Sequence, residues 1–216
     1  MNNTLDLLIP SLIETLYMIG ISAFFTILLG LPLGIILVVT EKNHIIPFPS
    51  LNKVLSTIIN VIRSLPAIIL IILIVPFTRF IVGTSIGTTA AIVPLVVAAT
   101  PFFARVVETS LKEVDWGIVE ASIAMGASPF QIILKVLLPE AMSSLALGIT
   151  ITLINILGYS AIAGIVGGGG LGDLAIRYGY HRFKTDVLIA AVIVLIVIVQ
   201  ITQFSGNFLA KTLKKS

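Results

Sequence analysis

Three glycines in the carboxyl-terminal third, Gly167, Gly169 and Gly172, have the Gly-x-Gly-x-x-Gly spacing of a loop that binds a dinucleotide pyrophosphate. That chemistry requires a strand before the glycines and a helix after them. Here the run follows a long apolar stretch, which argues against dinucleotide binding. We expect a flexible external loop or a partly re-entrant turn instead.

The other residues that could do chemistry do not combine into a catalytic site. Glu108, Glu113 and Asp115 are close in sequence, but no His or nucleophile accompanies them, and we interpret them as solvated ends. The chain has no Cys and only two His, His44 and His181, which disfavours a disulfide framework and a metal site. It also has no Gly-x-x-x-x-Gly-Lys-Ser/Thr sequence for ATP phosphates. We therefore predict that the chain is not an enzyme and that it binds no cofactor and no metal.

The composition is typical of a protein embedded in lipid. Hydrophobic residues make up 57% of the 216 residues and charged residues 11%, and the mean hydropathy is +1.15. Soluble domains carry about a quarter charged residues. The formal net charge of +3 is too small an excess to indicate a nucleic-acid partner. The chain is therefore predicted to be an integral membrane protein.

Five apolar stretches are long enough, or nearly so, to cross a bilayer. A spanning helix needs about 20 mainly apolar residues, and continuous runs without period-two alternation argue against a barrel. We predict an all-α polytopic membrane protein with a single transmembrane domain over residues 1–216. The predicted spans are 15–40, 55–78, 80–104, 141–166 and 187–210.

The positions of the basic residues predict the orientation of these spans. Five crossings place the two ends of the chain on opposite sides. If the carboxyl terminus is cytoplasmic, the inside segments contain Lys42, Lys53, Arg63, Arg105, Lys112, Lys135, Lys211, Lys214 and Lys215. The outside then contains Arg79, Arg177, Arg182 and Lys184. The positive-inside rule therefore favours an external amino terminus and a cytoplasmic carboxyl terminus, with Arg63 reaching to the headgroups.

The longest charged stretch between predicted spans, 105–140, predicts two short helices. Asp115 can cap the first, and Gly126 suits the left-handed residue that closes it. The second has the start of a capping box at 128–131. It should end before Pro139, because proline disfavours helical geometry in the preceding residue. On spacing alone, a loop that merely seals the bundle is an equal alternative.

This segment resembles the cytoplasmic signature of ABC-importer permeases. That signature reads Glu-Ala-Ala, three residues, Gly, nine residues and Ile-x-Leu-Pro. The chain has Glu120, Ala121 and Ser122, then Gly126, then Val-Leu-Leu-Pro at 136–139, with both spacings preserved. Ser122 replaces the second Ala of the signature, and Val replaces Ile.

Most of the chain after residue 52 is similar to the permease subunit of bacterial methionine ABC importers. The segments that carry this resemblance are 63–66, 76–79, 82–91, 167–173 and 175–180. The resemblance implies two identical permeases, two ATP-hydrolysing subunits and an external substrate-binding lipoprotein. It also implies methionine and related amino acids as substrates and the bacterial cytoplasmic membrane as the location. Osmoprotectant or phosphonate permeases remain alternatives for the substrate.

The resemblance further implies that residues 116–139 dock in a groove on the ATPase as a coupling helix. Glu120, Ala121 and Pro139 would contribute to this contact with the ATPase, with Glu120 as a polar anchor. Gly126 would form the bend. The external glycine-rich segment would face the binding protein.

Candidates for the pathway itself rest only on polarity within the fourth predicted span. They are Asn155, Tyr159 and Ser160, and ordinary helix packing is the alternative for each. An ion-coupled carrier is the rival mechanism, but it would need ionisable groups at mid-membrane and usually shows inverted repeats. A non-transporting membrane scaffold is a further alternative, but it would have no need of the coupling signature.

Overall fold

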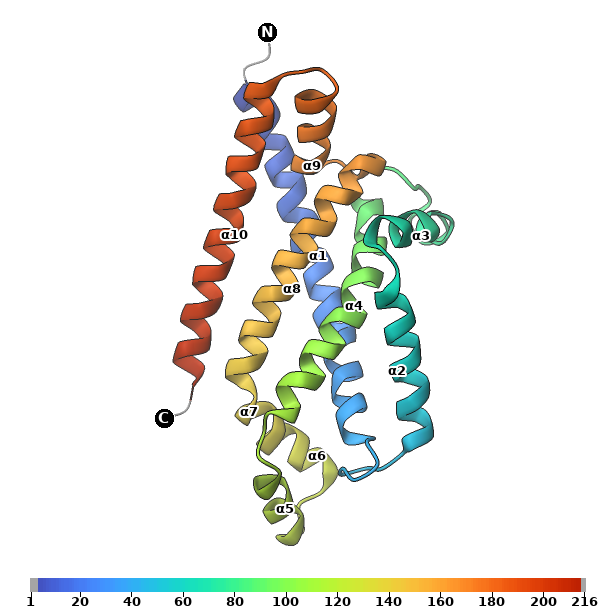
Figure 1. Cartoon of the computed structure of the whole chain (residues 1–216), viewed down its shortest axis with the longest axis vertical. Helices are drawn as coiled ribbons and strands as arrows, with labels where there is room; N and C mark the ends of the chain where they lie inside the picture. The colour runs from blue at the N-terminus through green and yellow to red at the C-terminus, as the bar shows by residue number, and fades with distance from the viewer. Residues whose placement is uncertain (1–3, 215–216) are drawn as a thin grey trace.

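Four long apolar helices run between the two ends of the molecule (Figure 1). The computed structural model describes residues 4–214 and has no strand among them. Each of these helices is long and apolar enough to cross a membrane, and a bent helix pair raises the count of candidate spans in the described chain to five. The predicted all-α fold is thus confirmed. The four are α1 (Thr4–Val39), α4 (Thr88–Lys112), α8 (Met142–Ala163) and α10 (Thr185–Leu213).

The first helix begins well before the predicted start of the 15–40 span. Asp6 and Glu14 precede the charge-free run in the sequence, but both lie inside α1. The fourth and fifth predicted spans, 141–166 and 187–210, lie over α8 and α10. Lys215, one of the basic residues used to predict the orientation, lies outside the described residues.

The predicted second span, 55–78, is sharply bent. It consists of α2 (Pro49–Ser64) and α3 (Ala67–Val82), which meet at an angle of 109°. Leu65 between them is extended, with φ −79° and ψ 133°. Pro66 causes this break because its ring disfavours helical geometry in the residue before it. α3 consequently turns away from the direction of α2 (Figure 1).

The predicted third span, 80–104, begins too early. α3 continues through residue 82 and ends at Gly83, whose φ of +82° closes the helix. A short connection follows, and α4 starts only at Thr88 and runs to Lys112. Sequence hydropathy misses this connection because none of its residues is charged.

Helix α2 ends beside the middle of α4, at the point where the chain turns into α3. Arg63, near the end of α2, lines a cavity with Ala98 and Phe102 of α4. At 1.5 Å per residue, Phe102 lies about 15 Å from the Lys112 end of α4 and about 21 Å from its other end. Arg63 is therefore placed beside the middle of α4 and not at its end, which does not fit the expectation that it reaches the headgroups.

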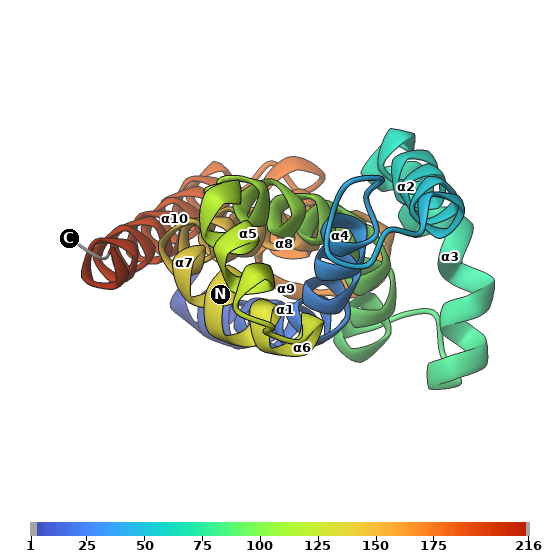
Figure 2. The same ribbon diagram turned by 90° about the horizontal axis from the view of Figure 1, so that it is seen from below.

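Short helices cover both ends of the bundle. Helix α1 begins and helix α10 finishes at opposite ends of the bundle, and α5 and α6 lie at the end where α10 finishes (Figure 1). Viewed from that end, α10 and the α2–α3 pair flank opposite sides of α1, α4 and α8 (Figure 2). The short elements are α5 (Trp116–Ala124), α6 (Pro129–Ile132), η1 (Ile133–Leu137), α7 (Leu138–Glu140), η2 (Gly164–Gly168), α9 (Gly170–Leu174) and η3 (Ala175–Tyr180).

Helices α1 and α4 pack closely because glycines replace larger side chains at their contact. A Cβ atom added at Gly34 would lie 2.5 Å from Cβ of Val107 and 2.6 Å from the Ala104 carbonyl oxygen. Since apolar side chains gain little from leaving lipid for another helix, close backbone approach supplies van der Waals contact instead.

We predict that Gly34→Ala destabilises the protein, whereas Gly20→Ala in the same helix does not. The added methyl group at Gly34 would overlap Val107, and overpacking costs roughly 1–3 kcal/mol. A Cβ at Gly20 meets no atom within 4 Å. Thermal unfolding in detergent, followed by circular dichroism, measures the difference. Equal melting temperatures for the two variants would contradict the packing argument.

Candidate functional site

The end of the bundle that carries α5 contains the residues of the predicted coupling segment. Asp115 caps α5, because its Oδ1 accepts a hydrogen bond of 2.7 Å from the Gly117 amide. This satisfies one of the free N–H groups at the start of a helix. The predicted cap is confirmed, and α5 begins at the next residue, Trp116.

Gly126 forms the turn that ends α5. Its φ is +80°, and its N–H donates to the Ile123 carbonyl at 2.9 Å. The next amide, of Ala127, donates to the Ser122 carbonyl at 3.1 Å. These two bonds form a Schellman motif. A Cβ at Gly126 would meet no atom within 4 Å, so the backbone conformation, and not space, requires glycine.

The second helix of the segment starts as the sequence predicts. The Ser128 amide donates to Oε1 of Gln131 at 2.8 Å, and the Gln131 amide donates to the Ser128 hydroxyl at 3.4 Å. The capping box therefore fixes where the chain re-enters helical geometry after the turn.

The predicted end of this helix before Pro139 is wrong. The helix continues through Pro139 to Glu140, and the chain bends at Ala141 before α8. The preceding turn, η1, is a π-helix in which the Leu138 amide donates to the Ile133 carbonyl, five residues earlier. A wider turn of this kind rearranges the backbone hydrogen bonds beside a proline, which has no N–H to donate.

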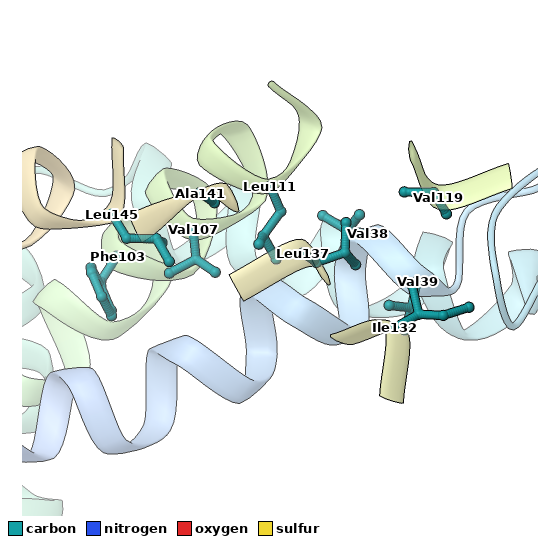
Figure 3. Close-up of a cluster of buried hydrophobic side chains, with 10 residues drawn as sticks. All are labelled: Val38, Val39, Phe103, Val107, Leu111, Val119, Ile132, Leu137, Ala141 and Leu145. Atoms are coloured by element: carbon teal, nitrogen blue, oxygen red, sulfur yellow. The ribbon is translucent and has the colours of Figure 1, made fainter. Parts of the chain in front are cut away.

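An apolar cluster fixes the segment α5–α7 to the bundle (Figure 3). Val119, Ile132 and Leu137 of the segment are each 1% exposed. They belong to one cluster with side chains of α1 and α4, which are Val38, Val39, Phe103, Val107 and Leu111. Burying each such side chain contributes about 1.5–3 kcal/mol. The segment is thus held against the ends of two long helices.

The outer face of the same segment exposes large apolar side chains. Met125 is 80% exposed, Phe130 69% and Trp116 43%. Glu120 and Ala121 are exposed on α5 as well. Exposed apolar surface beside polar groups is typical of a protein-interaction site. We call this the α5–α7 face, defined by Trp116, Glu120, Ala121, Met125 and Phe130.

The three predicted pathway residues do not share one environment. Asn155 and Tyr159 are half-buried and are four residues apart in α8, so they lie on the same face of that helix. Ser160 is 2% exposed, and its hydroxyl donates to the Leu157 carbonyl at 2.7 Å. Asn155 and Tyr159 therefore lie together on one face of α8, whereas the Ser160 hydroxyl is bonded within its own helix.

The glycine-rich segment, residues 167–172, forms a folded turn at the opposite end of the bundle. The Gly170 amide donates to Oε2 of Glu14 at 2.7 Å, and the Leu171 amide donates to the Thr15 hydroxyl at 2.8 Å. Both acceptors lie on α1. Of the two forms expected for this segment, the folded turn fits these contacts and the flexible loop does not. Sequence reasoning missed Glu14, whose partner is 156 residues away.

The predicted glycines have packing roles within this turn. The Gly167 carbonyl accepts a hydrogen bond of 2.9 Å from the Gly87 amide, which ties the turn to the start of α4. A Cβ at Gly172 would lie 2.5 Å from the Ala161 carbonyl oxygen. A Cβ at Gly169 would lie 2.8 Å from Oε2 of Glu14. Of the three, Gly172 is buried, and Gly167 and Gly169 are partly exposed.

A sequence profile of the family described as "Binding-protein-dependent transport system inner membrane component" matches residues 30–215. The chain belongs to this family. It is therefore a membrane-embedded permease component and not the enzyme of a transport system.

Two named relatives match most of the permease. The probable D-methionine transport system permease protein MetI of Vibrio cholerae serotype O1 is 50% identical over 206 residues, which are 95% of this chain and 92% of the relative. The D-methionine transport system permease protein MetI of Escherichia coli K12 is 53% identical over 158 residues, 73% of each chain.

Solved structures agree with the fold of the permease. A chain of the MetNI methionine ABC transporter, in an inward-facing conformation and native crystal form, has a TM-score of 0.97 at 46% identity, with both chains fully covered. A chain of an amino acid ABC transporter at 21% identity shares the fold, with a TM-score of 0.77 over 94% of this chain and 92% of that one.

A polar network joins α4 to α2 and to the loop after α1, next to the α5–α7 segment. Lys112, at the end of α4, pairs with Glu108 at 2.9 Å and with Glu41 beyond α1 at 2.7 Å. Arg105 pairs with Glu108 at 2.5 Å and donates to Oδ1 of Asn60 on α2 at 2.9 Å. Glu108 is only 9% exposed. The expectation that it is a solvated end is therefore wrong.

His44 contacts the α5–α7 face from the loop between α1 and α2. Its ring lies 5.2 Å from the Trp116 ring, measured between centroids. Burial lowers the pKa of His44 from its usual 6.5, the charge of Lys112 acts in the same direction, and Glu41 opposes it. Among the described residues, its Nδ1 has no hydrogen-bond partner. The neutral imidazole therefore suits this contact.

We predict that acidification weakens the contact between His44 and Trp116. Because the pKa is lowered in the folded protein, the contact is stable above pH 6.5 and is lost as pH falls through the lowered value. Trp116 is the only Trp, so its fluorescence reports on this site. Emission should change with a midpoint below 6.5 in the wild type and in the control His181→Gln. The same titration in His44→Gln would contradict the assignment.

Proposed function

We propose that this permease, together with a second copy, forms the translocation pathway of a bacterial ABC importer for methionine and related amino acids. The observation that carries the proposal is about 50% identity, over almost the full length, to permeases named for D-methionine transport. The inward-facing MetNI transporter chain, which this fold matches along its whole length, adds support.

The permease has no phosphate-binding loop, so two separate ATPase subunits supply the energy. Each docks on the α5–α7 face, where Met125 and Phe130 provide apolar contact and Glu120 a polar anchor. Closure of the ATPases around ATP moves the two α5–α7 segments. The ATP-bound and released states favour different bundle conformations only because they engage this face differently.

The α5–α7 face and the carboxyl terminus are cytoplasmic, and the amino terminus is external. The distribution of basic residues supports this orientation, since Lys42, Lys112, Lys135 and Lys211 belong to segments at the α5 end of the bundle. An external substrate-binding lipoprotein then meets the opposite end, where the glycine-rich turn lies. The rigid contacts of that turn with α1 give the lipoprotein a preformed surface.

Transport assays test the substrate. The permease, its ATPase and its binding protein, reconstituted in proteoliposomes, should accumulate labelled methionine only with ATP inside and binding protein outside. Unlabelled methionine should compete, and an osmoprotectant or a phosphonate should not. Preferential uptake of either of the last two would contradict the assignment of methionine.

Substitution of Gly126 tests the coupling role. Proline cannot adopt the observed φ of +80°, because its ring fixes φ near −65°. Gly126→Pro should therefore insert normally but separate ATP hydrolysis from uptake. Gly126→Ala, which pays only about 1–2 kcal/mol for the left-handed conformation, should have an intermediate effect. Methionine uptake per ATP hydrolysed measures both, and a wild-type ratio in Gly126→Pro would refute the coupling role.

A further inference from the structure

Arg63 is a cation that lies beside the middle of α4, a helix long and apolar enough to cross a membrane. It lines a cavity of about 150 Å³ with Phe102, which lies near the centre of α4. Its side chain is exposed, and no carboxylate of the described residues lies within ion-pair distance. Arg105 on the neighbouring helix α4 is not unpaired in this way, because it forms an ion pair with Glu108.

An exposed and unpaired arginine at this depth cannot face hydrocarbon without a large desolvation cost. Intramembrane charges of this kind face the interior of a bundle or a water-filled path. The face of α2 that carries Arg63 must therefore be covered by a second copy, by water or by a passing solute. This constraint defines which side of the permease points away from lipid.

Two cavities meet at Arg63 and continue along this face. The 150 Å³ cavity also contains Tyr159 and Leu65. A second cavity of about 290 Å³ shares Arg63 and Phe102 and extends along α4 past Arg105 and Thr109 to Glu113. Since Thr109 lies one turn from the end of α4, the two cavities together lead from the middle of α4 toward the α5–α7 segment.

We propose that Arg63 binds the carboxylate of the transported amino acid during its passage, at the cavity that Tyr159 also lines. A guanidinium presents paired N–H donors that match a carboxylate in two hydrogen bonds. Leu65 and Phe102 supply apolar surface for an aliphatic side chain. The inference rests on the proposed function, because it takes an amino acid as the solute.

Arginine variants in the complete transporter test this site. The complex of permease, ATPase and binding protein is reconstituted with wild type, Arg63→Gln, Arg63→Lys or the control Arg79→Gln. Arg79 is also exposed, but it lies on α3 and lines neither cavity. For each complex, assembly, ATP hydrolysis stimulated by loaded binding protein, and methionine uptake are measured.

Arg63→Gln should lower methionine transported per ATP by roughly tenfold, because a charge-assisted pair of hydrogen bonds is lost. Its assembly and stimulated hydrolysis should match those of wild type. Arg63→Lys should recover much of the ratio by restoring the charge, and Arg79→Gln should leave it unchanged. These results together would support a site on the pathway, since a purely structural role would not change the ratio alone.

Wild-type transport by Arg63→Gln would overturn the inference and leave the proposed function intact. Loss of the assembled dimer in Arg63→Gln would also overturn it, because Arg63 would then pair with a carboxylate of the second copy. Absence of methionine uptake by the unsubstituted complex would instead contradict the proposed function, and the inference with it.

Discussion

Hydrocarbon offers no hydrogen-bond partners, so each N–H and C=O group of a spanning chain must find its partner within the protein. Long helices meet this requirement along most of this permease. Where the helices break, other groups replace the missing bonds. The amides of Gly170 and Leu171 use side chains of α1, and the Gly87 amide uses the Gly167 carbonyl. The irregular segments are therefore as fully connected at these points as the helices between them.

The same bundle links its two ends mechanically. At one end, Val119, Ile132 and Leu137 are buried against α1 and α4, so a force on the α5–α7 face acts on both helices. The ion pair of Lys112 with Glu41 connects α4 with the segment after α1, and the hydrogen bond that Arg105 donates to Asn60 connects α4 with α2. At the other end, α1 holds the glycine-rich turn. Helix α1 thus contacts both regions proposed to bind partner proteins.

Local signals made part of this structure predictable. The Asp115 cap, the Gly126 turn and the Ser128 capping box each depend on atoms within a few residues, and all three could be predicted from sequence. The depth of Arg63 depends on the direction that α3 takes after Pro66, and the role of Glu14 depends on a residue 156 positions away. Such features are set by the packing of distant helices, which hydropathy and short motifs do not encode.

Helix α10 has a different relation to the bundle from that of the other long helices. In the most apolar 18-residue stretch of α10, only 11% of the residues are buried inside the protein, against 67% for the corresponding stretch of α4. Its buried positions are few, namely Val187, Ala191, Gly206 and Ala210. Elsewhere along α10, mutational tolerance should be wide, because any lipid-compatible side chain satisfies the surroundings. Sequence drift in this permease should therefore concentrate on α10, while α4 changes slowly.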